Sequence, residues 1–417
     1  MNEERKYQER DKKNLLEAFK NYRSVLFQCP TGGGKSVVAT DLVDGWIDKE
    51  NANVLVLAHR KELLNQFDKH FSSRNLEVGM MRGKIERNMN SNVVVASVFT
   101  ATRDNRLETL LKRDWDYIIV DECHRIMSES YAKPIREIRE VNAKCKLLGL
   151  TATPYRLDRK NLSEQFDTMI CSDDIATLTA NGYLAKQRTY VTPVKELDDI
   201  DTTNSGQDYK QEPLSAYMRT EEQIEYLVES YKKRGENRQM LVYCVDRKHA
   251  TDVANAYKNS NIIEAENAEE GGYEPNILTV GYIDGNTPEK EREAMLEAFA
   301  NGVLRIIVSI DTLTEGVDLP ETGCIQLARP TLSLSLYLQM VGRGLRPKKD
   351  GGDLIVLDNA GCSNSFGLVT SPKGWSLDGS IDPNDPRKGN KVVAKRKDGT
   401  YETDLDEAEH LELEEMT

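Results

Sequence analysis

The segment Pro30-Thr-Gly-Gly-Gly-Lys-Ser36 combines the residue types that bind a chain of phosphates. An apolar run typical of a strand precedes it, and a stretch typical of a helix, Val37–Trp46, follows it. In this context backbone N–H groups surround the phosphates, Lys35 reaches the β- and γ-oxygens, and Ser36 holds Mg²⁺. Cys29 replaces the first glycine of the usual pattern, where a small residue suffices; the alternative is a glycine-rich turn with an incidental lysine. The predicted phosphate-binding residues are Thr31, Gly32, Gly33, Gly34, Lys35 and Ser36.

Two adjacent carboxylates, Asp121 and Glu122, follow the apolar run Tyr117–Val120. At the carboxyl end of a strand in a parallel sheet they would lie beside the phosphate-binding segment. Asp121 is then expected to hold Mg²⁺ through water, and Glu122 to polarise the attacking water. Acid pairs at strand ends are more often solvated caps, but the position of this pair in the chain favours catalysis.

Two arginines, Arg343 and Arg346, stand in the segment Gln339-Met-Val-Gly-Arg-Gly-Leu-Arg346. Arginines that neutralise a transferring γ-phosphoryl group accelerate the reaction by roughly 10³–10⁵. Gly342 and Gly344 would let the backbone approach a ligand closely. These arginines can complete a site built around Lys35 only if the chain folds into two lobes that face each other. A basic helix start on the surface is the alternative.

Short β-branched runs alternate with helical stretches twice along the 417 residues, which indicates two parallel α/β sheets, each covered on both faces. We expect a first domain at 1–185, an interlobe connection at 186–222, a second domain at 223–370 and a polar, acidic, poorly ordered tail at 371–417. Residues 264–276 are expected to form a surface loop. The predicted strands are Val25–Gln28, Val54–Ala58, Val93–Ser97, Tyr117–Val120, Leu147–Leu150, Met240–Val245, Leu278–Ile283, Arg305–Ile310, Cys324–Ala328 and Leu354–Leu357.

The net charge of −13 argues against a polyanionic partner only at first sight. Residues 401–417 contain eight acids and no Lys or Arg, so the remaining body is near neutral and can hold a local basic track. The seven cysteines show no C-x-x-C spacing, which favours reduced thiols in a cytosolic protein over a zinc site or disulfides. No apolar stretch of membrane-spanning length and no secretory signal are found, so a cytoplasmic location is expected, in a bacterial or phage-infected cell.

The ordered set of motifs resembles the superfamily 2 helicases of the DEAD/DEAH type, with a DECH box at Asp121–His124. Within that superfamily it is most similar to the RadD-like branch of bacterial DNA-repair helicases, which is related to type III restriction motor subunits and phage helicases. The resemblance covers about residues 5–360. The motifs that carry it are Tyr7-Gln8, Pro30–Ser36, Leu57–Leu64, Asp121–His124, Thr151–Pro154, Thr314–Pro320 and Gln339–Arg346.

This resemblance implies an α/β fold of two tandem RecA-like parallel-sheet domains with an ATP cleft between them. It implies a nucleic-acid-dependent ATPase that uses ATP and Mg²⁺, translocates on DNA (single-stranded, duplex or forked) and unwinds or remodels it. RNA is the less favoured partner, and no membrane partner is expected. The RadD-like branch that this sequence resembles is expected to carry a C-terminal cysteine-rich zinc module. This sequence departs from that pattern, because it has no cysteine after Cys362.

The resemblance also implies individual roles. Gln8 would read adenine and Asp318 would contact the nucleotide, while Gln339 would join Lys35, Asp121, Glu122, Arg343 and Arg346 in catalysis. For the nucleic-acid contacts, a loop or helix-cap role is an equally good alternative. The implied coupling residues are His124, Thr151 and Thr153, and the implied nucleic-acid contacts are His59, Arg60, Ser97, Thr100, Arg247, Thr314 and Gly316.

Three other functions stay open on the sequence alone. One is an RNA helicase, which the branch of the motifs disfavours. Another is a double-strand translocase, or restriction-type motor subunit, that does not unwind. A binding module with a decayed site is disfavoured because every charged residue of the predicted catalytic set is present.

The acidic tail leads to a testable prediction. Eight acids at 401–417 can compete with DNA for a basic track or repel DNA, and both effects lower affinity at low salt. Deleting 401–417 should therefore tighten DNA binding, with a gain that shrinks as salt rises. Fluorescence anisotropy at about 50 mM salt tests this; equal affinities for the full-length and truncated proteins would mean that the tail is a solvated end without this role.

Overall fold

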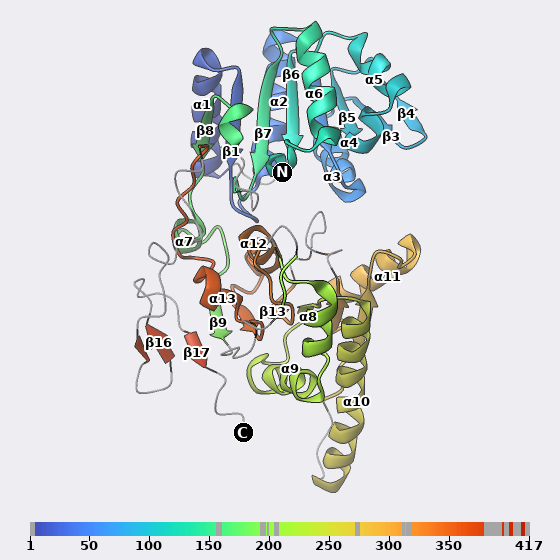
Figure 1. Cartoon of the computed structure of the whole chain (residues 1–417), viewed down its shortest axis with the longest axis vertical. Helices are drawn as coiled ribbons and strands as arrows, with labels where there is room; N and C mark the ends of the chain where they lie inside the picture. Colours follow the sequence, from blue (N-terminus) through green and yellow to red (C-terminus); the bar gives the residue numbers. More distant parts are fainter. Residues whose placement is uncertain are drawn as a thin grey trace. The chain divides into compact units, whose positions relative to one another are not determined.

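The computed structural model describes residues 5–155, 161–191, 197, 200–203, 208–271, 276–310, 313, 319 and 321–378, together with short strands between 394 and 412. The chain divides into two compact units. The first contains residues 1–174 and 374–382, and the second contains 175–373 and 383–417. Each unit holds one mainly parallel sheet with helices on its faces (Figure 1).

The first unit is built on eight strands in the order β4-β3-β5-β2-β6-β7-β1-β8. All neighbours are parallel except β3 and β4. The five predicted apolar runs correspond to β1, β2, β5, β6 and β7, and the first four of these are buried throughout because helices cover both faces. The strands are β1 Ser24–Gln28, β2 Val54–Ala58, β3 Val78–Arg82, β4 Ile85–Arg87, β5 Val93–Ser97, β6 Tyr117–Asp121, β7 Lys146–Thr151 and β8 Thr168–Cys171.

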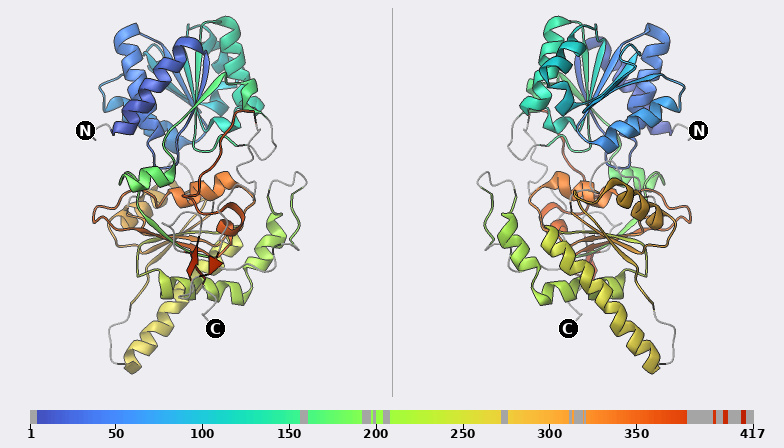
Figure 2. Two further views of the ribbon diagram at one scale, coloured as in Figure 1. Left: turned by 90° about the vertical axis from the view of Figure 1, so that its left-hand side faces the viewer. Right: turned by 90° about the vertical axis from the view of Figure 1, so that its right-hand side faces the viewer.

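The helices of this unit form one layer on each face of the sheet, which Figure 2 shows edge-on. Helices α1, α2 and α3 pack on one face, where Trp46 stacks on Tyr117 with ring centroids 3.8 Å apart. Helices α4, α5 and α6 pack on the other face around Trp115 and Tyr131. The helices are α1 Lys6–Asn21, α2 Lys35–Glu50, α3 Lys61–Ser72, α4 Val98–Ala101, α5 Asp104–Leu111 and α6 Glu129–Val141, with 3₁₀ turns η1 Cys123–Arg125 and η2 Leu162–Glu164.

The second unit is built on nine strands in the order β11-β12-β10-β13-β14-β9-β17-β16-β15. The pairs from β11 to β17 are parallel, and β15, β16 and β17 pair antiparallel. The five runs predicted for this half correspond to β10–β14. The strands are β9 Gln187–Val191, β10 Met240–Tyr243, β11 Val280–Ile283, β12 Ile306–Ser309, β13 Cys324–Leu327, β14 Leu354–Asp358, β15 Ala394–Lys395, β16 Thr400–Glu402 and β17 His410–Glu412.

Two segments of this unit differ from the expectation. Strand β9 lies inside the expected interlobe connection but pairs with β14, and the two units divide at Asp174/Ile175. Three short strands lie in the tail, where no regular structure was expected, and β17 pairs with β9. Strand β17 thus uses the hydrogen-bonding groups of β9 on the side away from β14, which would otherwise form an open sheet edge.

The helices of the second unit include one correction. Helix α10 runs to Gly271 and so takes in much of the expected 264–276 loop; Figure 2 shows it reaching beyond the sheet. The reason is composition, because the Glu- and Ala-rich run at 264–270 consists mostly of strong helix formers. The helices are α7 Ile175–Ala180, α8 Gln211–Met218, α9 Glu221–Arg234, α10 Arg247–Gly271, α11 Glu289–Ala300, α12 Leu334–Gly342 and α13 Cys362–Phe366. None of the helices that the structure describes combines the length and hydrophobicity needed to cross a lipid bilayer.

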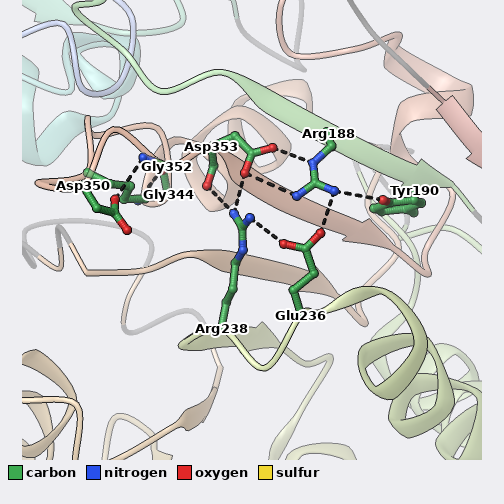
Figure 3. Close-up of polar contacts among 9 residues, drawn as sticks. Arg188, Tyr190, Glu236, Arg238, Gly344, Asp350, Gly352 and Asp353 are labelled. Carbon is green, nitrogen blue, oxygen red and sulfur yellow. Dashed lines mark hydrogen bonds and ion pairs between the residues drawn. The ribbon is translucent and has the colours of Figure 1, made fainter.

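An ion-pair network links the amino ends of β9, β10 and β14 (Figure 3). Asp353 accepts hydrogen bonds from Arg188 and from Arg238, the latter over 2.6 Å. Glu236 accepts from the same two arginines over 2.7 and 2.6 Å. Burial raises the pKa of Asp353, but the arginine hydrogen bonds and charges outweigh it and lower the pKa below its ordinary value. The network therefore stabilises the register of three strands through charge.

Replacing Asp353 with Asn should destabilise the second unit. Two half-buried guanidinium groups would lose an anionic partner, which costs about 1–2 kcal/mol after solvent screening. Because the folded-state pKa of Asp353 is lowered, its contribution is present above the unfolded value of about 4 and is lost as pH falls through the folded value. Calorimetry should show a Tm deficit at pH 7 that shrinks toward pH 3.

The matched control is Asp201→Asn, which removes the exposed Lys210–Asp201 pair. Its Tm should stay at the wild-type value. Equal stability of Asp353→Asn and wild type at pH 7 would show that the network does not stabilise the sheet.

Candidate functional site

The parallel sheet of the first unit brings the predicted first-unit residues to one edge. The carboxyl ends of β5, β2, β6, β7 and β1 follow one another in that order along the sheet. The phosphate-binding segment follows β1, the carboxylate pair ends β6, and the Thr151–Thr153 segment ends β7. His59 and Arg60 follow β2, and Ser97 ends β5. Ligands of open α/β sheets bind at this edge.

The phosphate-binding segment forms a tight loop that ends in helix α2. Gly32 and Gly34 adopt φ values of 84° and 85°, which favour glycine because a side chain is strained there. Helix α2 begins at Lys35, so its N-terminus lies at this edge. Such an N-terminus is an anion site when backbone and dipole point at the same ligand.

Helix α1 holds two side chains against this loop. The hydroxyl of Tyr7 donates to the Gly33 carbonyl over 2.6 Å, and the Gln8 amide donates to the same oxygen over 3.4 Å. The Gln8 side chain is buried, and a Cβ added at Gly34 would overlap its Nε2 atom. Gln8 therefore lies at the loop, where the sequence expected it. The motif contained Tyr7, but nothing in the sequence indicated its contact with Gly33.

Lys35 lies between the two predicted carboxylates. Its Nζ is 3.1 Å from Oδ1 of Asp121 and donates a short hydrogen bond to Oε1 of Glu122. Both carboxylates are buried. Burial alone would lower the pKa of Lys35, but the adjacent carboxylates raise it above its ordinary value, and complete burial raises the pKa of Asp121. The ammonium thus stays charged and compensates one of two buried negative charges.

This residue set fits a nucleotide with Mg²⁺. Two carboxylates and one ammonium leave a net negative charge in a buried place, which a divalent cation would balance. Ser36 is buried at the start of α2 beside Lys35. No group of three acidic, His or Cys side chains among the described residues could hold a metal alone. Mg²⁺ suits such a place because it takes its remaining ligands from water and phosphate oxygens.

Glu122 has an unusual backbone. Its φ of 49° and ψ of 48° lie in the left-handed region, which is uncommon for a residue other than glycine. Backbone strain of this kind costs about 1–3 kcal/mol and gathers at functional sites. The conformation ends β6 and begins η1. The carboxylate of Glu122 then meets Lys35 on one oxygen and lies 3.4 Å from Nδ1 of His124 on the other.

The three predicted coupling residues form a continuous chain of contacts. Nδ1 of His124 lies 3.2 Å from Oγ1 of Thr151, and that oxygen accepts a hydrogen bond from the backbone N–H of Thr153 over 3.1 Å. Together with the Glu122 contact, this chain links Lys35 to the end of β7 inside the first unit. Gln339 belongs to the second unit.

The first-unit candidates for nucleic-acid contact divide into two groups. His59 and Arg60 are half-buried between β2 and α3. Ser97 and Thr100 are buried, and Oγ1 of Thr100 accepts a hydrogen bond from the N–H of Gly83 over 2.8 Å. Through that contact the Thr100 hydroxyl stabilises a loop, which is the alternative to nucleic-acid contact that the sequence left open.

In the second unit, Arg247 begins α10 at the carboxyl end of β10 and pairs with Asp284 over 2.8 Å. Gln339 is buried in α12, and Arg343 and Arg346 follow that helix, both half-buried. Burial raises the pKa of Tyr243, and the charge of Arg343 partly offsets this. Thr314, Gly316 and Asp318 lie outside the described residues.

The reason given for Gly344 needs correction. The sequence suggested that its missing side chain lets the backbone approach a ligand. A Cβ at Gly344 would instead overlap Leu354 and touch Ile325 at 3.0 Å. The glycine therefore lets the segment of Arg343 and Arg346 pack on strands β13 and β14.

Asp208 is a positioning residue that the sequence did not indicate. Its carboxylate accepts hydrogen bonds from the Leu332 N–H over 3.0 Å and the Thr331 hydroxyl over 3.1 Å. It lies 3.6 Å from Nη2 of Arg329. Asp208 thus connects the segment 186–222, which was expected to link the two domains, to the loop that precedes α12. Asp208 and Thr331 are 123 residues apart in the sequence. Their contact depends on the tertiary fold, so no local sequence pattern could have predicted it.

Comparison with known families agrees with the geometry of both units. Residues 2–156 match the family described as "Type III restriction enzyme, res subunit". Residues 222–348 match the family described as "Helicase conserved C-terminal domain". The chain belongs to the superfamily 2 helicases. Among them it lies in the branch that resembles restriction-enzyme motors.

Individual relatives of this superfamily 2 helicase support the assignment. The "Putative ATP-dependent helicase IRC3" of Saccharomyces cerevisiae is 29% identical over 82% of this chain and 49% of its own length. The "Putative mitochondrial ATP-dependent helicase irc3" of Schizosaccharomyces pombe is 28% identical over 85% of this chain and 57% of its own. The chain thus spans about half the length of these curated relatives.

Solved structures confirm the fold of two RecA-like domains. A fragment of an HsdR subunit assigned to a type I restriction enzyme from Vibrio vulnificus superposes with a TM-score of 0.65 at 20% identity. It covers 90% of this helicase chain, which covers 67% of that fragment. The Pyrococcus furiosus Hef helicase domain superposes with a TM-score of 0.51 at 18% identity, over 85% of this chain and 95% of that domain.

The contacts of Glu122 generate a catalytic prediction. Glu122→Gln keeps the shape of the side chain but removes the charge that would polarise water. ATP and DNA binding should persist while hydrolysis falls by orders of magnitude. Lys35→Ala should weaken ATP binding itself, because the phosphates lose their cation. Equilibrium ATP binding and phosphate release, measured on both variants, separate the two effects; near wild-type hydrolysis by Glu122→Gln would falsify its role.

Proposed function

We propose that this chain is a nucleic-acid-dependent ATPase that couples ATP hydrolysis to translocation on DNA and to its unwinding or remodelling. The contact of Lys35 with both Asp121 and Glu122 at the phosphate loop carries the proposal. The contact brings one ammonium and two carboxylates together. In the proposal, these groups would serve the phosphates, Mg²⁺ and the attacking water. The family assignment and the names of the helicase relatives support the same activity.

In the proposed reaction, Lys35 exchanges its carboxylate contacts for the β- and γ-oxygens of ATP. Mg²⁺ would supply charge neutralisation at those oxygens, held by Ser36 and, through water, by Asp121. Glu122 then has one oxygen available to orient water, while His124 retains the other. Gln8, on α1, would read the adenine edge beside the loop that it already contacts.

The second unit would complete the site. Arg343 and Arg346 would act on the γ-phosphate in a closed state of the protein, so hydrolysis would await closure. Gln339 would join His124 on closure, and Asp318 would contact the nucleotide. Nucleic acid that favours the closed state would accelerate hydrolysis. Phosphate contacts by residues such as Arg60 and Arg247, and by Thr314 and Gly316, would hold the strand without sequence preference.

A second candidate is a motor that moves along duplex DNA without unwinding it. The match of residues 2–156 to a restriction-enzyme subunit favours this possibility. Triplex displacement on duplex DNA, measured beside unwinding of a fork, separates the two activities. A role in DNA repair and a cytoplasmic location are further proposals; the seven free cysteines, six of them buried, suit a reducing compartment.

The decisive test of the proposed function is the ATPase rate with single-stranded, duplex and forked DNA and with matched RNA. At least one DNA polymer should raise the rate well above the value without polymer, and RNA should raise it less. Lys35→Ala should abolish the stimulated rate. Absence of stimulation by every polymer would contradict the proposal, and stimulation by RNA alone would replace DNA as the partner.

Arg346→Ala provides a prediction for the second unit. Loss of an arginine that stabilises the γ-phosphoryl transition state should lower DNA-stimulated turnover by at least about 10²-fold, with little change in ATP affinity. Lys349→Ala is the control, because its ammonium lies close in sequence, is exposed and pairs only on the surface with Glu321. An Arg346→Ala protein with turnover equal to that of the control would place the transition-state charge elsewhere.

A further inference from the structure

Phe99 is an exposed aromatic residue on an otherwise buried turn. It is 59% exposed, whereas the other three residues of α4, Val98, Thr100 and Ala101, are buried. The hydrogen bond from the Gly83 N–H to Thr100 fixes α4 to the turn between β3 and β4. The Phe99 ring is therefore presented to solvent by a backbone that is held in place.

The sheet places Phe99 beside the expected phosphate contacts. Strands β2 and β5 are neighbours, with Ala58 paired to Ser97. Arg60 and Phe99 each lie two residues after those partners, so both follow the carboxyl ends of neighbouring strands. These ends lie at the edge that carries the phosphate loop and the carboxylate pair.

The surroundings of Phe99 are basic although the chain as a whole is acidic. Arg82 and Lys84 flank Gly83, and Arg103 follows α4. Within the described part of the chain, none of these three cations forms an ion pair. The nearby acids have other partners, since Glu86 pairs with Arg106 and Asp104 pairs with Lys133. An exposed ring among uncompensated cations suits a ligand that has both phosphates and flat aromatic faces.

We propose that Phe99 is a stacking platform for an unpaired base of single-stranded nucleic acid, with Arg82, Lys84 and Arg103 attracting the adjacent phosphates. Every base has a π-face, so stacking adds affinity without sequence preference. Duplex bases are already stacked on one another and are not available to the ring. This inference rests on the proposed function and adds a preference for single strands at the edge of the first unit.

The test compares Phe99→Ala with wild type by fluorescence anisotropy on three ligands of equal length. These are a single-stranded oligonucleotide, the same strand with abasic sites, and the duplex. Stacking predicts that Phe99→Ala weakens single-strand binding by about 5- to 100-fold, and leaves abasic and duplex binding unchanged. The slope of log affinity against log salt should stay the same, because the phosphate contacts remain.

Two further variants sharpen the result. Tyr22→Ala removes a ring that is 44% exposed at the amino edge of the same sheet, and it should bind like wild type. Phe99→Trp should keep the affinity and lose indole fluorescence when the single strand binds. Equal single-strand affinities for Phe99→Ala and wild type would overturn the inference, as would equal losses on abasic or duplex DNA, which would instead indicate a general surface effect.

A failure of the Phe99 stacking role can be distinguished from a failure of the proposed function. Wild-type ATPase that is stimulated by DNA, together with unchanged single-strand binding in Phe99→Ala, refutes only the stacking role. Failure of every polymer to bind wild type refutes both.

Discussion

The contact of Lys35 with two buried carboxylates is the interaction on which the rest of the account depends. A buried ammonium and two buried carboxylates are costly to desolvate, and they persist because each compensates another. Without a ligand, Lys35 serves as the counter-ion of Asp121 and Glu122. In the proposed function, a nucleotide with its cation would take over that compensation and free Lys35 for the phosphates. The same charges would then favour a polyphosphate that carries a divalent ion.

The parallel sheet makes this arrangement possible because it collects the carboxyl ends of five strands at one edge. Glycines at 32 and 34 permit the loop, and the left-handed backbone of Glu122 turns its carboxylate toward both Lys35 and His124. The contacts of His124 with Thr151 extend the cluster toward β7. Side-chain contacts thus run from Lys35 to the end of the neighbouring strand β7, and in the proposed function they would carry a change at the γ-phosphate. The second unit repeats the design, with Arg247 and the start of α12 following its own parallel strands.

Much of the fold and of the candidate site was predictable from the sequence, because these features depend on local sequence patterns. Buried parallel strands appear as continuous apolar runs, so β1, β2, β5, β6 and β7 were found, and the loop and carboxylates directly follow such runs. Other features depend on contacts between distant residues. Asp208 was hidden because its partners lie more than 120 residues away, and the packing of Gly344 on Leu354 had no local signal. The Ala- and Glu-rich end of α10 was expected to be a loop, but its residues are strong helix formers and the helix runs to Gly271. Phe99 follows an apolar strand, so sequence alone would place it in the core; only the structure shows its exposed ring.

In the proposed function, the binding of nucleotide and the binding of nucleic acid are coupled, so that each ligand changes the affinity for the other. The direct test is the DNA affinity of the wild-type chain without nucleotide, with ADP, and with a non-hydrolysable ATP analogue. The account predicts that the analogue changes DNA affinity relative to ADP, and that DNA changes the affinity for the analogue by the same factor, since coupling of binding is reciprocal. Identical DNA affinity in all three nucleotide states would contradict it.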